Sequence, residues 1–129
     1  MQAVEELWKT YQDWKRLTEE EGTAIQRSHW YEVHSAQQQK RALQTDIVRL
    51  TDEIKANFRN AREEKKFDTR LRGIVNELIL LETQNNLKVQ ACIASAQEKT
   101  SSLEATANRL RQVHTRYVPP RDPIWQNLS

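Results

Sequence analysis

The sequence predicts an all-α fold: an elongated antiparallel helical bundle, or a coiled-coil hairpin, of three helices with a very long third helix. No proline occurs before Pro119, so no proline interrupts a helix over most of the 129 residues. Gln, Glu, Lys, Arg, Ala and Leu, which are good helix formers, fill this span. Apolar residues recur along it at spacings of three and four. Residues 1–117 are therefore predicted to form a single helical domain.

The first helix is predicted over residues 3–27. Val4, Leu7, Tyr11 and Trp14 recur at alternating spacings of three and four. Leu17, Ala24 and Ile25 keep roughly the same face apolar. An amphipathic helix of this kind buries one face and leaves the other in water.

The second helix is predicted over residues 29–58. Its apolar stripe consists of Val33, Ala36, Leu43, Ile47, Leu50 and Ile54. Lys40 is the polar member of this heptad series, and we expect it to snorkel or pair with a carboxylate rather than act as a base. Val33 lies 29 residues after Val4, one more than four heptads, so the two stripes are out of phase. This favours a joint at Ser28 and His29, with Ser28 as the N-cap of the second helix.

A turn is predicted between Lys55 and Arg70, where apolar residues become sparse. Asn60 and Glu63 have the spacing of a capping box, which places the start of the third helix at residue 61. The alternative is that Asp68 caps this helix.

The third helix is predicted over residues 61–117. Its apolar stripe consists of Ile74, Leu78, Leu81, Asn85, Val89, Ile93, Ala96, Leu103, Ala107, Leu110 and Tyr117. Some fifty residues make a helix roughly 75 Å long, about twice the length of the second helix. If the first helix folds back beside the second, the C-terminal half of the third has no cover for its stripe. If the first arm is nearly continuous, it covers the whole stripe.

Residues 118–129 are predicted to be an irregular tail. Pro119, Pro120 and Pro123 exclude a helix there. Ile124 and Trp125 stand among polar residues, and two interpretations remain open: a disordered end, or a segment that docks on the domain or on a partner.

The sequence contains no catalytic motif, so neither an enzyme nor a cofactor is expected. Two isolated glycines cannot build a phosphate-binding loop. His29, Glu32 and His34 are close in sequence, but His34 is poorly aligned with the other two, and zinc needs three or four ligands. A solvated joint is the favoured interpretation.

The cysteine content and the lack of a secretion or membrane signal make the cytoplasm the expected location. The single cysteine cannot form an internal disulfide, which fits a reducing compartment. The longest apolar run, residues 78–81, is far too short to span a membrane, and the N-terminus does not resemble a signal peptide. The net charge is only +2, from 20 basic and 18 acidic residues that are mostly interleaved, as on a solvated helix face.

A nucleic-acid-binding helical domain is one alternative function. Basic and aromatic residues gather near the C-terminus: Arg109, Arg111, His114, Arg116, Tyr117, Arg121 and Trp125. Stacking beside a basic groove is a known mode of binding single strands. The small net charge argues against this alternative, and cations in a last helical turn also interact favourably with the helix dipole.

Two stretches carry a resemblance to a known family. The pattern Leu17-x3-Glu21-x2-Ala24-Ile25-x4-Trp30-x2-Val33-x6-Lys40-x2-Leu43-x3-Ile47 resembles the N-terminal half of flagellar export chaperones of the FlgN type and their FliT-like relatives. The later Ile79-x-Leu81-x3-Asn85-Asn86, followed by a long polar helix that ends at Tyr117, is also similar to that family.

The resemblance implies a small cytoplasmic chaperone that uses no nucleotide. Such proteins hold hook–filament junction (hook-associated) proteins or the filament cap protein by a helical C-terminal segment and bring them to a type III export apparatus. Carried onto this chain, the partner-binding residues are Val89, Ile93, Ala96, Leu103, Ala107, Leu110 and Tyr117.

A coiled-coil stalk or adaptor, like the export component of the FliJ type, is the second interpretation. In such a protein the apolar stripes are covered within the chain, and the charged outer surface carries the function. An uncovered stripe predicts instead that the free protein hides it, because exposed apolar surface tends to find a partner. Two copies can pair as a homodimer, or the tail with Ile124 and Trp125 can fold back over the stripe.

Overall fold

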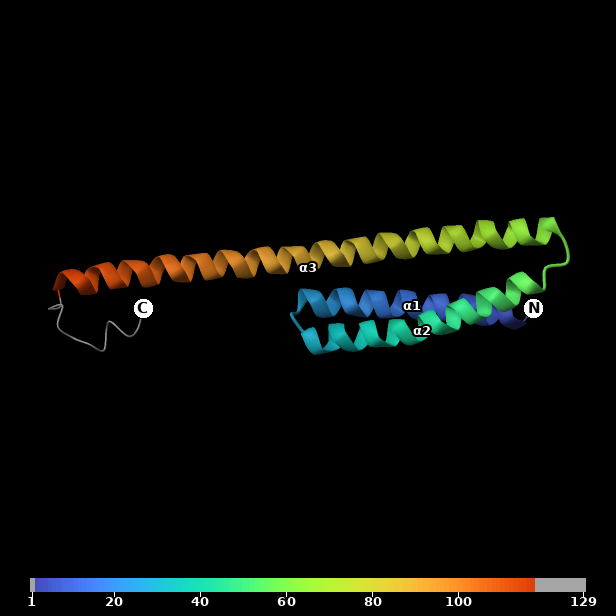
Figure 1. Ribbon diagram of the computed structural model, residues 1–129, viewed down its shortest axis with the longest axis horizontal. Helices are drawn as coiled ribbons and strands as arrows, with labels where there is room; N and C mark the ends of the chain where they lie inside the picture. The colour runs from blue at the N-terminus through green and yellow to red at the C-terminus, as the bar shows by residue number, and fades with distance from the viewer. Residues whose placement is uncertain (1, 118–129) are drawn as a thin grey trace. The chain divides into compact units, whose positions relative to one another are not determined.

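The computed structural model describes residues 2–117, and over that range the protein is helical with no strand (Figure 1). Helix α1 spans Gln2–Gln26, α2 spans Trp30–Ala56 and α3 spans Ala61–Tyr117. The predicted all-α class with a very long third helix is confirmed. Each helix begins and ends within two residues of its predicted range. The tail predicted over residues 118–129 lies outside the described residues.

The chain divides into two compact units, Met1–Cys92 and Ile93–Ser129, and α3 contributes to both. In the first unit α1 folds back on α2, and the two helices pack side by side (Figure 1). The alternative of a nearly continuous first arm is therefore wrong. Helices α1 and α2 have 25 and 27 residues, so their hairpin is less than half as long as α3, which has 57.

The joint between α1 and α2 is formed by backbone hydrogen bonds around Ser28, whose φ of 57° lies in the left-handed region. The Ser28 N–H donates to the Ile25 carbonyl at 3.1 Å, and the His29 N–H donates to the Ala24 carbonyl at 2.9 Å. This pair of bonds defines a Schellman motif. The joint lies where it was predicted, but the predicted role of Ser28 is wrong. Ser28 terminates α1, and His29 is the N-cap of α2, without a side-chain capping bond.

The turn between α2 and α3 consists of residues 57–60, within the predicted range. The Glu63 N–H donates to Asn60 Oδ1 at 2.9 Å, and the Arg59 N–H donates to Glu63 Oε2 at 3.1 Å. The predicted capping pair is confirmed, although the Glu63 carboxylate binds one residue before the N-cap rather than the N-cap itself. The alternative cap, Asp68, is wrong because it lies inside α3.

The apolar core of the first unit consists of two clusters. The turn cluster, near the α2–α3 turn, contains Leu7, Leu50, Ile54 and Phe67. The joint cluster, beside the α1–α2 joint, contains Ala24, Ile25 and Val33, with Val89 and Cys92 packed against them. In the turn cluster the ring of Phe67 lies 5.5 Å from that of Trp8 and 5.4 Å from that of Phe58.

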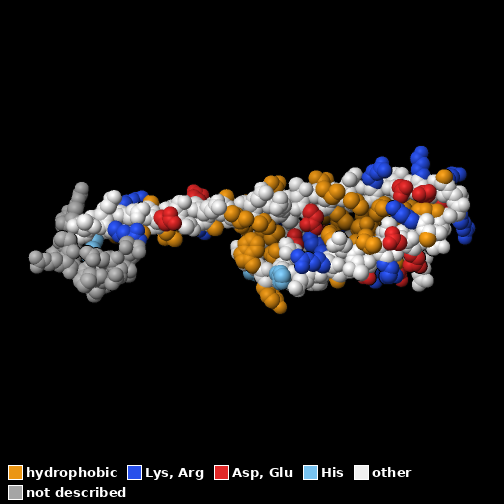
Figure 2. Space-filling model, viewed as in Figure 1, with side chains coloured by type: hydrophobic (Ala, Val, Ile, Leu, Met, Phe, Trp, Pro, Cys, Tyr) orange, Lys and Arg blue, Asp and Glu red, His pale blue; other side chains and the backbone are white. Residues whose placement is uncertain are grey.

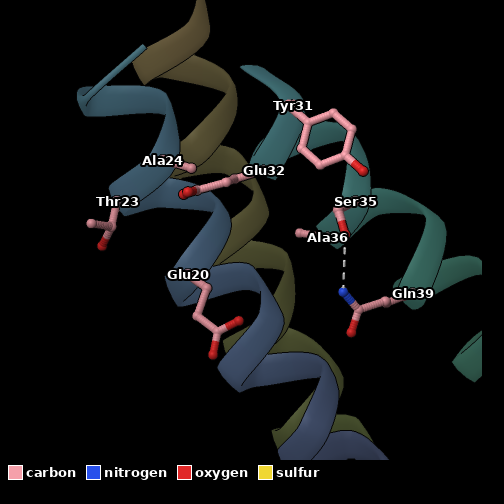
Figure 3. A pocket seen from close by; sticks show the side chains of 8 residues that line it. All are labelled: Glu20, Thr23, Ala24, Tyr31, Glu32, Ser35, Ala36 and Gln39. Carbon is pink, nitrogen blue, oxygen red and sulfur yellow. Dashed lines mark hydrogen bonds between the residues drawn. The ribbon is translucent and has the colours of Figure 1, made fainter. Parts of the chain in front are cut away.

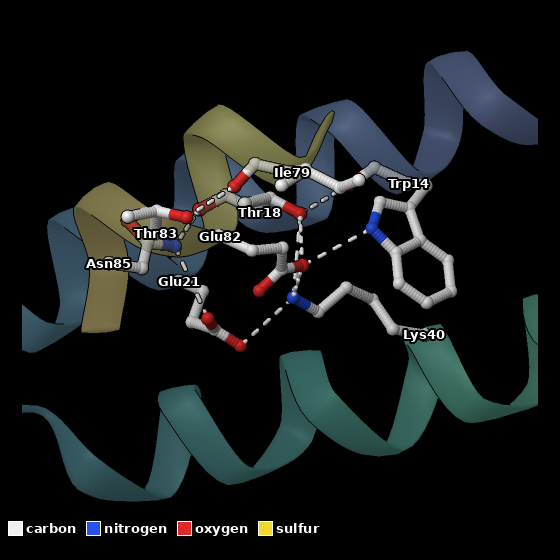
Figure 4. A network of polar contacts seen from close by, with 8 residues as sticks. All are labelled: Trp14, Thr18, Glu21, Lys40, Ile79, Glu82, Thr83 and Asn85. Atoms are coloured by element: carbon white, nitrogen blue, oxygen red, sulfur yellow. Dashed lines mark hydrogen bonds and ion pairs between the residues drawn. The ribbon is translucent and has the colours of Figure 1, made fainter. Parts of the chain in front are cut away.

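A buried polar network separates the two apolar clusters. Each of the three helices contributes residues to it, at positions between those that the helix contributes to the two clusters. The Lys40 Nζ of α2 is 2.5 Å from Glu82 Oε1 of α3 and 3.3 Å from Glu21 Oε2 of α1 (Figure 4). The side chains of Lys40 and Glu21 are only 7% and 5% exposed. Trp14 Nε1 donates to the same Glu82 oxygen at 3.2 Å. The prediction that Lys40 pairs with a carboxylate is confirmed, and the pairing joins all three helices.

Asn85 extends this network to the backbone of α1. Its Nδ2 donates to the Thr18 carbonyl at 2.8 Å and to Glu21 Oε1 at 3.2 Å. A Cβ added at Gly22 would lie 2.6 Å from Asn85 Oδ1. The close approach of Asn85 to α1 therefore depends on a position without a side chain.

Gly22→Ala should lower the free energy of unfolding by about 1–3 kcal/mol, because the added methyl group displaces an amide that two hydrogen bonds hold in place. Gly73→Ala is the matched control, because nothing lies within 4 Å of a Cβ at that helical position. It should raise the free energy of unfolding by about 0.4–1 kcal/mol. Urea denaturation followed by circular dichroism measures the free energy of unfolding of both variants. If Gly22→Ala stabilised the protein as Gly73→Ala does, the close contact between residue 22 and Asn85 would be contradicted.

Ser28→Gly should raise the free energy of unfolding by about 0.5–1 kcal/mol. A left-handed conformation is unfavourable for serine and free for glycine, and the higher entropy of glycine in the unfolded chain offsets part of the gain. Ser28→Val should have the opposite effect. Thermal denaturation of the two variants checks this, and a stabilising valine would exclude the left-handed backbone at the joint.

Lys40→Met should lower the free energy of unfolding by about 3–5 kcal/mol, because it leaves the buried Glu21 carboxylate without its cation. Adding Glu21→Gln to this variant should recover part of the loss. Lys15→Met is the control: Lys15 donates to Glu77 at 2.7 Å, which raises the lysine pKa, but both side chains are exposed. Chemical denaturation should show little effect of that change, and equal losses from Lys15→Met and Lys40→Met would contradict a special role of Lys40.

Candidate functional site

The predicted partner-binding residues lie along the C-terminal half of α3, and the structure separates the first of them from the rest. Val89 is half-buried and packs against the joint cluster, so its side chain belongs to the core of the first unit. The remaining residues, Ile93 to Tyr117, belong to the second unit. None of the side chains from 93 to 115 is buried.

Large aliphatic side chains are exposed in this second unit. Leu103 is 70% exposed and Leu110 is 65% exposed, and Ile93 is exposed as well. Ala96 is exposed and Ala107 is half-buried. Figure 2 shows hydrophobic side chains reaching the surface of α3. The side chain of Tyr117 lies outside the described part of the chain, so its place in the predicted set stays a prediction.

The spacing of these residues defines a surface that we call the client stripe: Ile93, Ala96, Leu103, Ala107 and Leu110. Ala96, Leu103 and Leu110 follow one another at intervals of seven residues. Ile93 lies three residues before Ala96, and Ala107 lies four residues after Leu103. Residues with this spacing share one face of a helix. A stripe of this kind matches the seam that a second helix fills in a coiled coil.

Sequence reasoning missed several other exposed apolar side chains. Val113 lies beside the client stripe and is exposed. In the first unit Leu80 and Leu87 are 63% and 59% exposed, although the neighbouring Leu78 is buried. The seven-residue spacing of Leu80 and Leu87 is a signal that could have identified this second face.

A groove lies between α1 and α2 beside their joint (Figure 3). It has a volume of about 410 Å³ and is lined by Glu20, Thr23, Ala24, Tyr31, Glu32, Ser35, Ala36 and Gln39. Figure 3 shows Glu32 reaching from α2 toward α1, whereas Glu20 lies along α1. Sequence reasoning did not predict this groove, because its walls come from two helices whose packing angle no local pattern encodes.

The residues weighed for metal binding do not assemble into a ligand set. His29 Nδ1 lies 3.6 Å from Glu32 Oε2. Among the described residues no group of three His, Cys, Asp or Glu side chains could hold a metal ion. Cys92 is half-buried, and its Sγ lies 3.7 Å from the Ile25 carbonyl oxygen, as expected of a cysteine that packs as a small hydrophobe.

The basic residues considered for nucleic-acid binding lie in the second unit. Arg109 and Arg111 are exposed, and Arg111 Nη1 donates to Asn108 Oδ1 at 3.0 Å. Arg121 and Trp125, which belong to the same hypothesis, lie outside the described residues. Among the described helices, none combines the length and the apolar character that a membrane span requires.

This chain was compared with models of protein families, with curated proteins and with solved structures. None of the three comparisons found a match.

Proposed function

We propose that this protein is a non-enzymatic export chaperone of the FlgN type, which binds a helical segment of a late flagellar or type III substrate in the cytoplasm. The exposed client stripe in the second unit is the observation that carries the proposal. Leu103 and Leu110 leave most of their surface in water. A partner that covers such residues removes apolar surface from water, and this favours binding.

The pattern of the stripe favours a helical client. Helix-in-groove and added-helix contacts draw their affinity from a few apolar anchors at spacings of three, four and seven residues. Leu103, Ala107 and Leu110 have this spacing. A hook-associated or cap protein with a helical C-terminal segment supplies the complementary surface, as the resemblance implies.

The stalk or adaptor hypothesis requires the same residues to be covered within the chain. Exposure of Leu103 and Leu110 supports the chaperone over the stalk. Self-association of the free protein stays part of the proposal, because a second copy can cover the stripe when no client is present.

Leu103→Ala combined with Leu110→Ala should weaken client binding by about 1–3 kcal/mol for each anchor, and should barely change the thermal stability. Calorimetric titration with synthetic peptides measures the affinity. The peptides should be the helical C-terminal segments of the hook-associated and cap proteins encoded in the same genome. If both leucines were core residues of a full-length hairpin, each change would instead cost roughly 2–5 kcal/mol of folding stability.

Leu80→Ala combined with Leu87→Ala is the matched control. These leucines lie on the same helix, are also seven residues apart and are nearly as exposed. This variant should bind the peptides as the unaltered protein does. Equal weakening by both double variants would show that the peptides bind exposed leucines without preference, and unfolding of the Leu103/Leu110 variant with unchanged affinity would favour the stalk.

A further inference from the structure

The groove between α1 and α2 belongs entirely to the first unit and is independent of the client stripe. Its centre is lined by small side chains: Ala24 and Ala36 are buried, with Thr23 and Ser35 beside them. Small residues on two neighbouring helices allow a third helix to approach their backbones closely. The groove is therefore shaped for an added helix.

An exposed aromatic side chain stands at the rim of this groove. Tyr31 is 85% exposed, and the adjacent Trp30 is about half exposed. Neither belongs to the apolar clusters of the first unit. Tyrosine and tryptophan are the residue types that most often anchor protein interfaces, because they offer a large contact area with few rotatable bonds.

The charged side chains that line the groove have one sign. Among the described residues that line it, Glu20 and Glu32 are the only charged ones, and none is a lysine or arginine. Glu20 pairs with Arg16 at 3.1 Å, and both carboxylates keep more than half of their surface in water. The protein as a whole carries a net charge of +2, so this acidic site contrasts with the rest of the chain. A negatively charged surface attracts a positively charged partner.

We propose that this groove binds a basic helical segment of a second partner protein. A lysine or arginine of that segment would lie between Glu20 and Glu32, a small residue one turn away would contact Ala24 and Ala36, and an aliphatic residue would pack on Tyr31. The walls of the groove are helices whose backbone hydrogen bonds are internal, which excludes an added β-strand. This surface and the client stripe serve different partners.

A fluorescein-labelled, 18-residue alanine-based peptide tests the proposal. Leucine and arginine residues are placed along this basic peptide at alternating spacings of three and four. A second, acidic peptide has the same sequence with glutamate in place of each arginine. Fluorescence anisotropy should show binding of the basic peptide only. Glu20→Lys combined with Glu32→Lys should weaken that binding at least tenfold at low salt, whereas Glu53→Lys with Glu98→Lys, an equal change of charge at exposed sites, should have little effect.

Tyr31→Ala separates the apolar contact from the ionic one. It should weaken binding several-fold at both low and high salt, whereas the effect of the charge reversal should fade at high salt as screening removes the attraction. The Leu103→Ala/Leu110→Ala variant should bind the basic peptide normally. Circular dichroism confirms that each variant is folded.

Three results would overturn the groove proposal: no binding of the basic peptide, equal weakening by the control charge reversal, or loss of binding in the Leu103→Ala/Leu110→Ala variant. The last result would place the peptide on the client stripe. None of these outcomes concerns the client peptides, so the groove proposal and the proposed chaperone function can fail separately.

Discussion

The contact of one lysine with two carboxylates is the constraint on which the first unit depends. Lys40, Glu21 and Glu82 each come from a different helix, and two of the three side chains are almost fully buried. A buried charge is tolerated only with its partner in place. Moving any helix by one turn, about 5.4 Å, would separate the charges, whereas apolar contacts are non-directional and tolerate such a shift. The network therefore specifies the alignment of the helices, and the two apolar clusters supply most of the driving force.

The two units use their apolar residues in different ways. In the first unit the stripes of all three helices meet in the turn cluster and the joint cluster, on either side of the polar network. In the second unit the stripe continues along α3, but none of its described side chains is buried. The surfaces that result differ in chemistry. The client stripe is aliphatic and uncharged, whereas the groove beside the joint is acidic with an aromatic rim. One small chain thus presents two surfaces of different chemistry, as the two proposals require.

Features that depend on neighbours in sequence were predictable, and features that depend on packing were not. Helix bounds and the Asn60–Glu63 cap follow from periodicity and from side chains three residues apart. The sequence pattern predicts the wrong role for Ser28, because a Schellman motif is made by backbone groups, which the identity of a side chain does not reveal. The partners of Lys40 lie far away in sequence, so only the tertiary structure identifies them. The burial of Val89 depends in the same way on where the hairpin of α1 and α2 ends.

Most side chains of α3 between residues 93 and 115 are exposed, which has a thermodynamic consequence for the binding proposed there. A helix in water without a packing partner is held by its own backbone bonds and residue propensities, so it opens locally at low free-energy cost. A ligand that binds only the closed helix is then coupled to helix formation by linkage, and its measured affinity contains the cost of ordering the segment. Under this coupling, substitutions that never touch a ligand still change its affinity. Ser101 and Ser102 are exposed and are weaker helix formers than alanine. Replacing them with alanine would tighten binding by favouring the helix, and amide hydrogen exchange measures that opening directly.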